Sequence, residues 1–109
     1  MSVREPKAWI TGEEFGQERR RLLQGGFDDD SPELKRLWSR VHERDEYLWE
    51  MYAKPLIGQH SGEWAAVSLR GEVIIRPTGA EVHQAAREQF GPTNFVYGRL
   101  AAFRGYEVG

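Results

Sequence analysis

Hydrophobic residues recur at helical spacing in the first half of the chain. A Thr-x-x-Glu start signal at residues 11–14 and a stop at Gly25-Gly26 predict a helix over residues 11–24. Its apolar side is narrow, so this helix needs tertiary contacts to persist. That side consists of Phe15, Leu22 and Leu23.

A longer helix is predicted over residues 32–54. Ser31 offers a capping hydroxyl, Pro32 suits the first helical position, and Lys54-Pro55 is the predicted end. One face is apolar over about 30 Å, at 1.5 Å per residue, and is interrupted by Arg44 and Asp45. This apolar stripe consists of Leu34, Leu37, Trp38, Val41, Leu48, Trp49 and Tyr52.

A stripe of this length needs a cover longer than a small sheet. Either the first helix or a second copy of the chain is expected to lie along it. The seven stripe residues are therefore the candidate protein-interface residues, and a homodimer is one expected arrangement. Trp9, which precedes the first helix, is expected to clamp the N-terminal segment onto the domain or onto a partner.

After Gly62 the rhythm changes from helical to extended. Residues 64–69 and 72–76 are predicted strands, joined by a two-residue Arg70-Gly71 link, and together they form a hairpin. A second Thr-x-x-Glu signal at residues 78–81 starts a helix that Gly91-Pro92 closes, and residues 94–103 supply a third strand. The second half therefore reads β-β-α-β.

These elements predict an α+β fold in a single domain, residues 1–109, with a helical part at 1–57 and a ββαβ part at 58–109. The crossover rule places the third strand parallel to the second, in a small three-stranded mixed sheet. The strand order is expected to be 2-1-3, because the 64–69 strand is apolar on both faces, as a central strand is.

Composition narrows the class of protein without naming a partner. The 109 residues carry a net charge of -2, contain no cysteine and include no stretch of membrane-spanning length. Disulfides, thiol catalysis and thiolate metal sites are thereby excluded. With no secretory signal in residues 1–10, we expect a soluble, cytoplasmic protein that does not bind membranes.

No catalytic, metal or cofactor motif is recognisable. His42, His60 and His83 lack the spacing of a ligand set, and the acidic run at residues 28–30 lacks the glycine and terminal Glu of a calcium loop. That run is expected to solvate a turn and to favour the start of the following helix. The serines lie in no nucleophile elbow. We therefore predict a protein without catalytic residues, metal or cofactor, with a ligand site or active site at His60 or His83 as one alternative.

A nucleic-acid surface is a further alternative, although a nearly neutral chain disfavours it. Two groups of side chains motivate it: an arginine run on the first helix and an alternating set on the last strand, where rings could stack on bases. The first group is Arg19, Arg20 and Arg21, and the second is Phe95, Tyr97 and Arg99.

Residues 52–103 carry a family resemblance. The segments Gly62-Glu63-Trp64-Ala65-Ala66-Val67 and Gly71-Glu72-Val73-Ile74, followed by the Ala85-Ala86 helix and Phe95-Val96, resemble a family of short bacterial and archaeal proteins of unknown function that have a Gly-Lys-Trp-Val-Ala-like hairpin core. The lysine is Glu63 here and the valine is Ala65. This resemblance implies the hairpin fold and no activity. The leading hypothesis is thus a non-catalytic accessory or interaction protein that acts through its long helix and its sheet edge.

Overall fold

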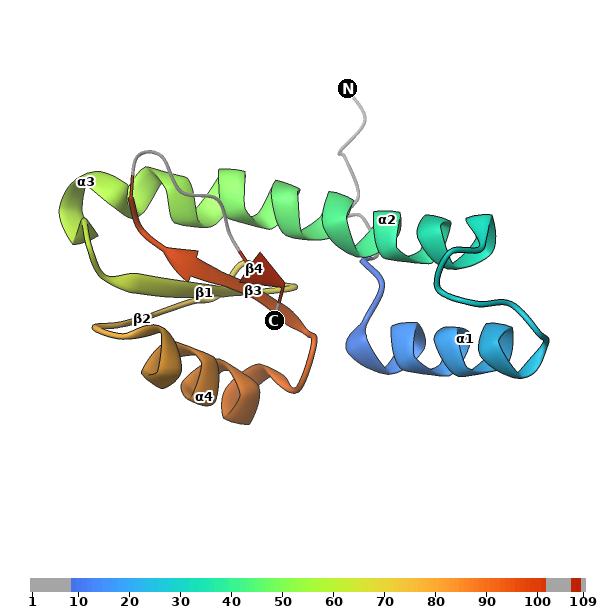
Figure 1. The fold of residues 1–109 in the computed structure, drawn as a ribbon. Helices are drawn as coiled ribbons and strands as arrows, with labels where there is room; N and C mark the ends of the chain where they lie inside the picture. Colours follow the sequence, from blue (N-terminus) through green and yellow to red (C-terminus); the bar gives the residue numbers. More distant parts are fainter. Residues whose placement is uncertain (1–8, 102–106, 109) are drawn as a thin grey trace, which may run out of the picture.

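The computed structural model describes residues 9–101 and 107–108. A four-stranded sheet lies between two helical layers, with α2 on one face and α4 on the other, while α1 packs beside the first half of α2 (Figure 1). The elements in chain order are α1 (Gly12–Gln24), α2 (Pro32–Leu48), the π-helical turn η1 (Trp49–Ala53), the 3-10 turn η2 (Lys54–Leu56), α3 (Ile57–His60), β1 (Trp64–Ser68), β2 (Val73–Arg76), α4 (Gly79–Phe90), β3 (Phe95–Arg99) and β4 (Glu107–Val108).

The sheet confirms the α+β class and corrects its description. The strand order is β2-β1-β3-β4, so the expected 2-1-3 order holds for the first three strands and β4 extends it. Every pairing is antiparallel, and the sheet is not mixed. The α4 crossover carries the chain past β1, so β2 and β3 run parallel to each other without pairing, each antiparallel to the β1 strand between them.

The β1–β2 hairpin is confirmed, but the link between its strands is two residues longer than predicted. Residues 69–72 form this link, which is closed by hydrogen bonds from Gly71 N to Ser68 O at 3.0 Å and from Ser68 N to Glu72 O at 2.9 Å. Gly71 adopts a φ of 86°, which favours glycine. The Tyr52 ring lies directly against Gly71, so the π-helical turn touches the hairpin at this point.

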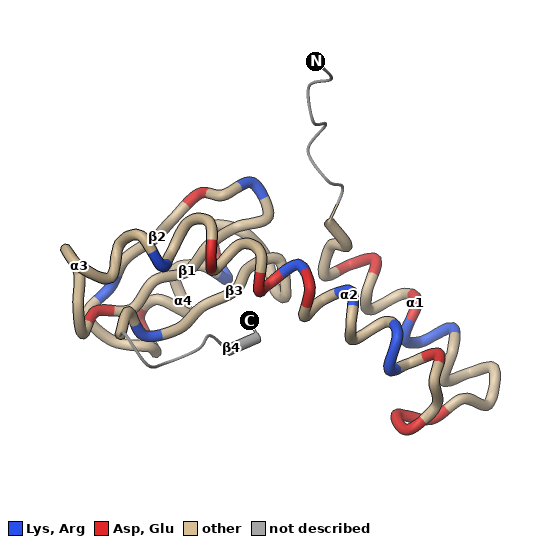
Figure 2. The backbone as a smooth tube through the Cα atoms, turned by 90° about the horizontal axis from the view of Figure 1, so that it is seen from above, with Lys and Arg blue, Asp and Glu red and all other residues tan. Residues whose placement is uncertain are grey.

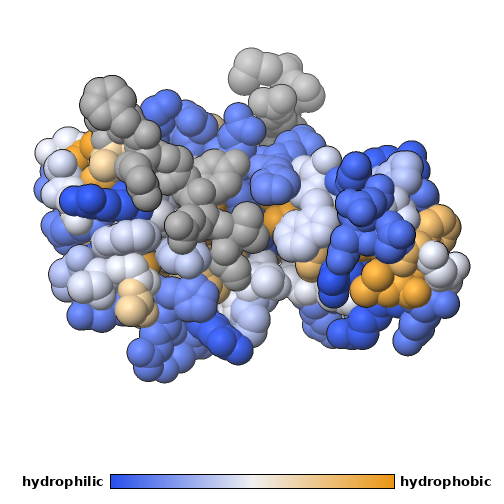
Figure 3. Space-filling view, in the orientation of Figure 1, coloured by the Kyte–Doolittle hydropathy of each residue, from blue (hydrophilic) through white to orange (hydrophobic). Residues whose placement is uncertain are grey.

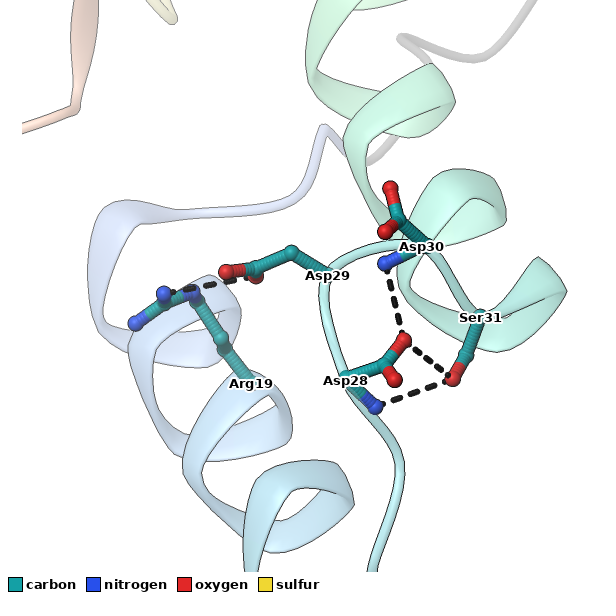
Figure 4. A network of polar contacts seen from close by, with 5 residues as sticks. All are labelled: Arg19, Asp28, Asp29, Asp30 and Ser31. Carbon is teal, nitrogen blue, oxygen red and sulfur yellow. Dashed lines mark hydrogen bonds and ion pairs between the residues drawn. The ribbon is translucent and has the colours of Figure 1, made fainter.

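The two helices of the first half start in different ways. The predicted capping box of α1 is present, because Thr11 Oγ1 accepts from Glu14 N at 3.1 Å and Glu14 Oε1 accepts from Thr11 N at 3.0 Å. Ser31 precedes α2, but its side chain caps no helix amide. Its hydroxyl instead accepts from Asp28 N and donates to Asp28 Oδ1, as Figure 4 shows. The expected Ser31 cap is wrong, since this local turn competes for the same oxygen.

The predicted end of the long helix at Lys54-Pro55 is also wrong. The chain continues through η1, η2 and α3 as far as His60, so the expected part boundary between residues 57 and 58 falls within α3. Pro55 is tolerated because it stands in the first turn of the new 3-10 segment, where a missing amide hydrogen breaks no internal bond.

Three apolar clusters build the core. One joins α1 to the first half of α2, through residues such as Phe15, Leu22 and Leu37. A second joins the last turn of α2 and η1 to the sheet, through residues such as Trp49 and Val96. The third joins the opposite sheet face to α4 and comprises Ala66, Ile74, Val82, Ala86 and Phe95, with Trp64, Ala85, Phe90 and Tyr97 at its margin. The long helix is therefore shared between two clusters.

The start of α1 is tied to the sheet part by two polar contacts. Gly12 N donates to Asn94 Oδ1 at 2.6 Å, and Asn94 Nδ2 donates to the carbonyl of Phe90 at the end of α4 at 3.2 Å. On the α2 side, Arg44 Nη1 donates to the carbonyl of Ile10 at 2.8 Å. The segment that leads into α1 is thus held from two directions.

Candidate functional site

The predicted interface stripe is largely covered by the chain itself. Trp38 is partly buried and packs edge-on against Phe15, with ring centroids 4.6 Å apart, and Tyr52 is exposed. Helix α1 covers the first half of the stripe and the sheet covers the second, so the first of the two expected covers is present within one chain. The buried members are Leu34, Leu37, Val41, Leu48 and Trp49.

Another side of α2 and of the η1 turn that continues it leaves large hydrophobic groups in solvent. Tyr47, Met51 and Tyr52, which we call the helix flank, are 43%, 53% and 37% exposed. The spacing from Tyr47 to Met51 makes these two side chains neighbours on a helix surface. The Trp9 ring packs on Tyr47 with centroids 5.2 Å apart, so Trp9 itself contacts the domain, as one of the two expected placements has it. Of the three helix flank residues, the predicted stripe contains only Tyr52, because Tyr47 and Met51 lie outside the main apolar period.

Two further hydrophobic side chains are exposed near the far end of α1. Leu23 is on the last turn of the helix and Phe27 is in the loop that follows. Figure 3 shows hydrophobic surface at this end of the molecule, set among hydrophilic residues. Leu23 was expected to belong to the apolar side of the first helix, and its exposure leaves that side even narrower.

A buried ion pair lies where the two clusters of α2 meet. Arg44 and Asp45 are fully buried, and Arg44 Nε donates to Asp45 Oδ1 at 2.9 Å. Within the described part of the chain, Arg44 Nη2 and Asp45 Oδ2 have no hydrogen-bond partner. Burial raises the pKa of Asp45 above its ordinary value of 3.8, and the neighbouring Arg44 guanidinium offsets only part of that effect. Arg44 and Asp45, which interrupt the apolar stripe, are therefore removed from water without a full set of hydrogen bonds, and this desolvation lowers the stability of the fold.

The raised pKa of Asp45 makes its contribution to stability depend on pH. Between 3.8 and the folded-state pKa, the folded protein binds the Asp45 proton more tightly than the unfolded chain does. This contribution is fully present below 3.8 and is lost as the pH rises through the folded-state pKa. We expect the free energy of unfolding of the wild type, minus that of Asp45→Asn, to fall with rising pH. Urea unfolding of both proteins at a series of pH values measures this difference. A difference that stays constant or increases with rising pH contradicts the raised pKa of Asp45.

The two groups of the predicted nucleic-acid surface lie on different parts of the molecule. Arg19, Arg20 and Arg21 are on α1, where Arg19 pairs with Asp29 at 3.4 Å and Arg21 pairs with Glu18. Figure 2 shows that basic and acidic segments alternate along α1 and α2. Phe95 is buried beneath α4 and belongs to the core. Of this group on β3, Tyr97 is partly buried and Arg99 is exposed.

Tyr97 lines a shallow cleft of about 360 Å³ beside the start of α4. The other walls are Trp64 from β1 and Gly79, Ala80 and His83 from α4. The His83 and Tyr97 ring centroids are 5.0 Å apart, and those of Trp64 and Tyr97 are 6.4 Å apart. All three rings are partly buried. We call this the aromatic cleft.

A second cleft of about 280 Å³ lies where the hairpin turn, the end of α4 and Thr11 meet. Ser68 lines it, but Ser68 Oγ already accepts from Arg70 N at 3.2 Å and from Glu72 N at 3.0 Å. This hydroxyl oxygen therefore stabilises the turn.

No family model, curated protein or solved structure matches this chain. The resemblance of residues 52–103 to a family with a Gly-Lys-Trp-Val-Ala-like core therefore remains a prediction.

The remaining candidate groups have ordinary local partners. His60 Nδ1 lies 3.2 Å from Glu63 Oε1, and His42 packs against Trp38. The acidic run at residues 28–30 organises a turn, in which Asp28 Oδ1 accepts from Asp30 N at 3.0 Å. Among residues 9–101, no group of three His, Asp or Glu side chains could hold a metal ion. None of the helices described is both long and apolar enough to cross a bilayer.

Proposed function

We propose that this protein is a non-catalytic interaction module that binds an apolar surface of another protein chain, or of a second copy of itself, through the helix flank. The observation that carries this proposal is the exposure of Tyr47, Met51 and Tyr52 beside a stripe that the chain already covers. Tyrosine and methionine are enriched at protein interfaces, where large side chains supply contact area.

The sheet edge supports the proposal less than the helix flank does. β2 is the outer strand on one side of the sheet. The Arg76 side chain donates from Nη1 to the carbonyl of Ile75 at 2.8 Å, which occupies an acceptor of this short strand, and Pro77 follows directly. Such features blunt an edge against pairing with a further strand.

Photo-crosslinking tests the helix flank. A photoreactive phenylalanine analogue at position 51 is expected to form a covalent adduct with a partner chain in cells, because Met51 stands at the centre of the flank. The same analogue at position 36, an exposed site on α2, is the control and is expected to give none. Sedimentation velocity then shows whether the partner is a second copy. Equal labelling at both positions, together with a monomer at every concentration, overturns the proposal.

A further inference from the structure

The aromatic cleft has the form of a preformed ring platform. The Trp64 ring lies so close to the start of α4 that a Cβ atom at Gly79 would come within 3.2 Å of it. Tyr97 neighbours both Trp64 and His83, and His83 also packs edge-on against the buried Phe95 ring at 5.6 Å. Each ring is thus held by other rings or by backbone, while part of its surface faces the cleft.

Two arginines flank this platform because of the strand register. Trp64 on the central strand is paired with Arg76 on one side and with Arg99 on the other. Residues directly opposite in an antiparallel sheet share a face, so the three side chains form a row on the α4 face. Both arginines are exposed, and within the described residues neither forms an ion pair with a carboxylate.

Of the acidic residues near the row, Glu107 on β4 is the strand partner of Tyr97, and Glu63 is directed elsewhere. Glu63 precedes Trp64, so its side chain leaves the strand on the opposite side, and it contacts His60. The row itself thus carries the two arginine charges, although the whole chain carries -2. Local potential, and not net charge, determines whether an anion is attracted to one cleft.

From this arrangement we propose that the aromatic cleft binds a nucleobase that carries a phosphate. The base stacks on the Trp64 and Tyr97 rings, and the phosphate is bound by Arg76 and Arg99. Rings stack on every base, and guanidinium groups bind phosphate through paired N–H donors. A free nucleotide and a single-stranded nucleic acid share this chemistry. The cleft lies on the α4 face of the sheet and the helix flank on the α2 side, so this inference does not depend on the proposed protein contact.

Binding of two probes tests the inference and separates the two sources. One probe is a mixed-sequence, fluorescently labelled single-stranded oligonucleotide, followed by anisotropy at low salt. The other is adenosine monophosphate, followed by chemical-shift changes of the Trp64 indole and of the α4 amides. Saturable binding of the mononucleotide identifies a nucleotide ligand, whereas saturable binding of the strand alone identifies single-stranded nucleic acid.

Exposed arginines provide matched variants that leave the core untouched. Arg76→Gln/Arg99→Gln is expected to weaken binding of either probe by about tenfold or more and, for a strand, to lower the salt slope of log K by about 0.7, the value for one lost phosphate contact. Arg20→Gln/Arg40→Gln removes the same charge from α1 and α2 and is expected to leave affinity nearly unchanged.

Tyr97→Leu, with circular dichroism as the folding check, is expected to lower the binding affinity about tenfold through lost stacking. Failure of both probes to bind at low salt, or equal losses in both arginine pairs, overturns the inference.

Discussion

Replacing Arg44 alone by Met is expected to destabilise the fold by about 3–5 kcal/mol. Asp45 is fully buried, and its Oδ1 receives the Arg44 Nε hydrogen bond at 2.9 Å, so the single change leaves a buried carboxyl group without its cation. The Ile10 carbonyl also loses the donor that lies 2.8 Å away. Urea unfolding followed by far-UV circular dichroism measures the change in the free energy of unfolding.

The double variant Arg44→Met/Asp45→Leu is expected to recover most of that loss and to unfold within about 2 kcal/mol of the wild type. Apolar side chains remove both desolvation costs, and the pair already leaves Arg44 Nη2 and Asp45 Oδ2 without partners among the described residues. Arg40→Met, at an exposed site on the same helix, is the control and is expected to stay within about 0.5 kcal/mol. If the double variant is less stable than Arg44→Met, the ion pair is not the costly element that its burial indicates.

Two glycines of α1 are expected to respond in opposite directions to the same substitution. Gly12→Ala is expected to destabilise the protein by about 1–3 kcal/mol, because the added methyl group overlaps the Pro92 carbonyl and the Thr93 side chain. Any shift that relieves the overlap also stretches the hydrogen bond from Gly12 N to Asn94 Oδ1. Thermal unfolding of the variant measures the loss.

Gly16→Ala is the matched control within the same helix. The nearest group to an added methyl at this position is Arg20 Nη1 at 3.7 Å, an ordinary contact distance. Because Ala is a better helix former than Gly, this change is expected to stabilise the protein by up to about 1 kcal/mol. Destabilisation of similar size at both positions contradicts the close packing of α1 on the loop before β3.

Local signals in the sequence predict this fold where neighbouring residues decide the outcome. The capping box at Thr11, the glycine stop after α1 and the β1–β2 hairpin all depend on short-range hydrogen bonds and backbone preferences. Predictions from the same kind of local signal were wrong at Ser31 and Pro55. The Ser31 hydroxyl accepts from Asp28 N in a turn and caps no helix, and Pro55 stands at the start of a new 3-10 turn and does not end the helical segment.

The candidate surfaces were predicted less well, because they depend on contacts between distant residues. Tyr97 and Arg99 were proposed as a stacking strand, but Trp64 and Arg76 join them only through the pairing of three strands. Arg19, Arg20 and Arg21 carry the same type of charge and lie on another element. Residue type alone does not distinguish arginines that flank an aromatic ring from a run of arginines on a helix that also carries acidic residues.

The amino-acid sequence by itself determined the switch from a helical to an extended rhythm, the α+β class and the amphipathic character of the long helix. Only the tertiary structure decided that α1 and the sheet share that helix, and which aromatic groups remain in solvent. The physical reason is that hydrophobic burial is not directional, so an apolar stripe requires a cover without specifying which surface provides it.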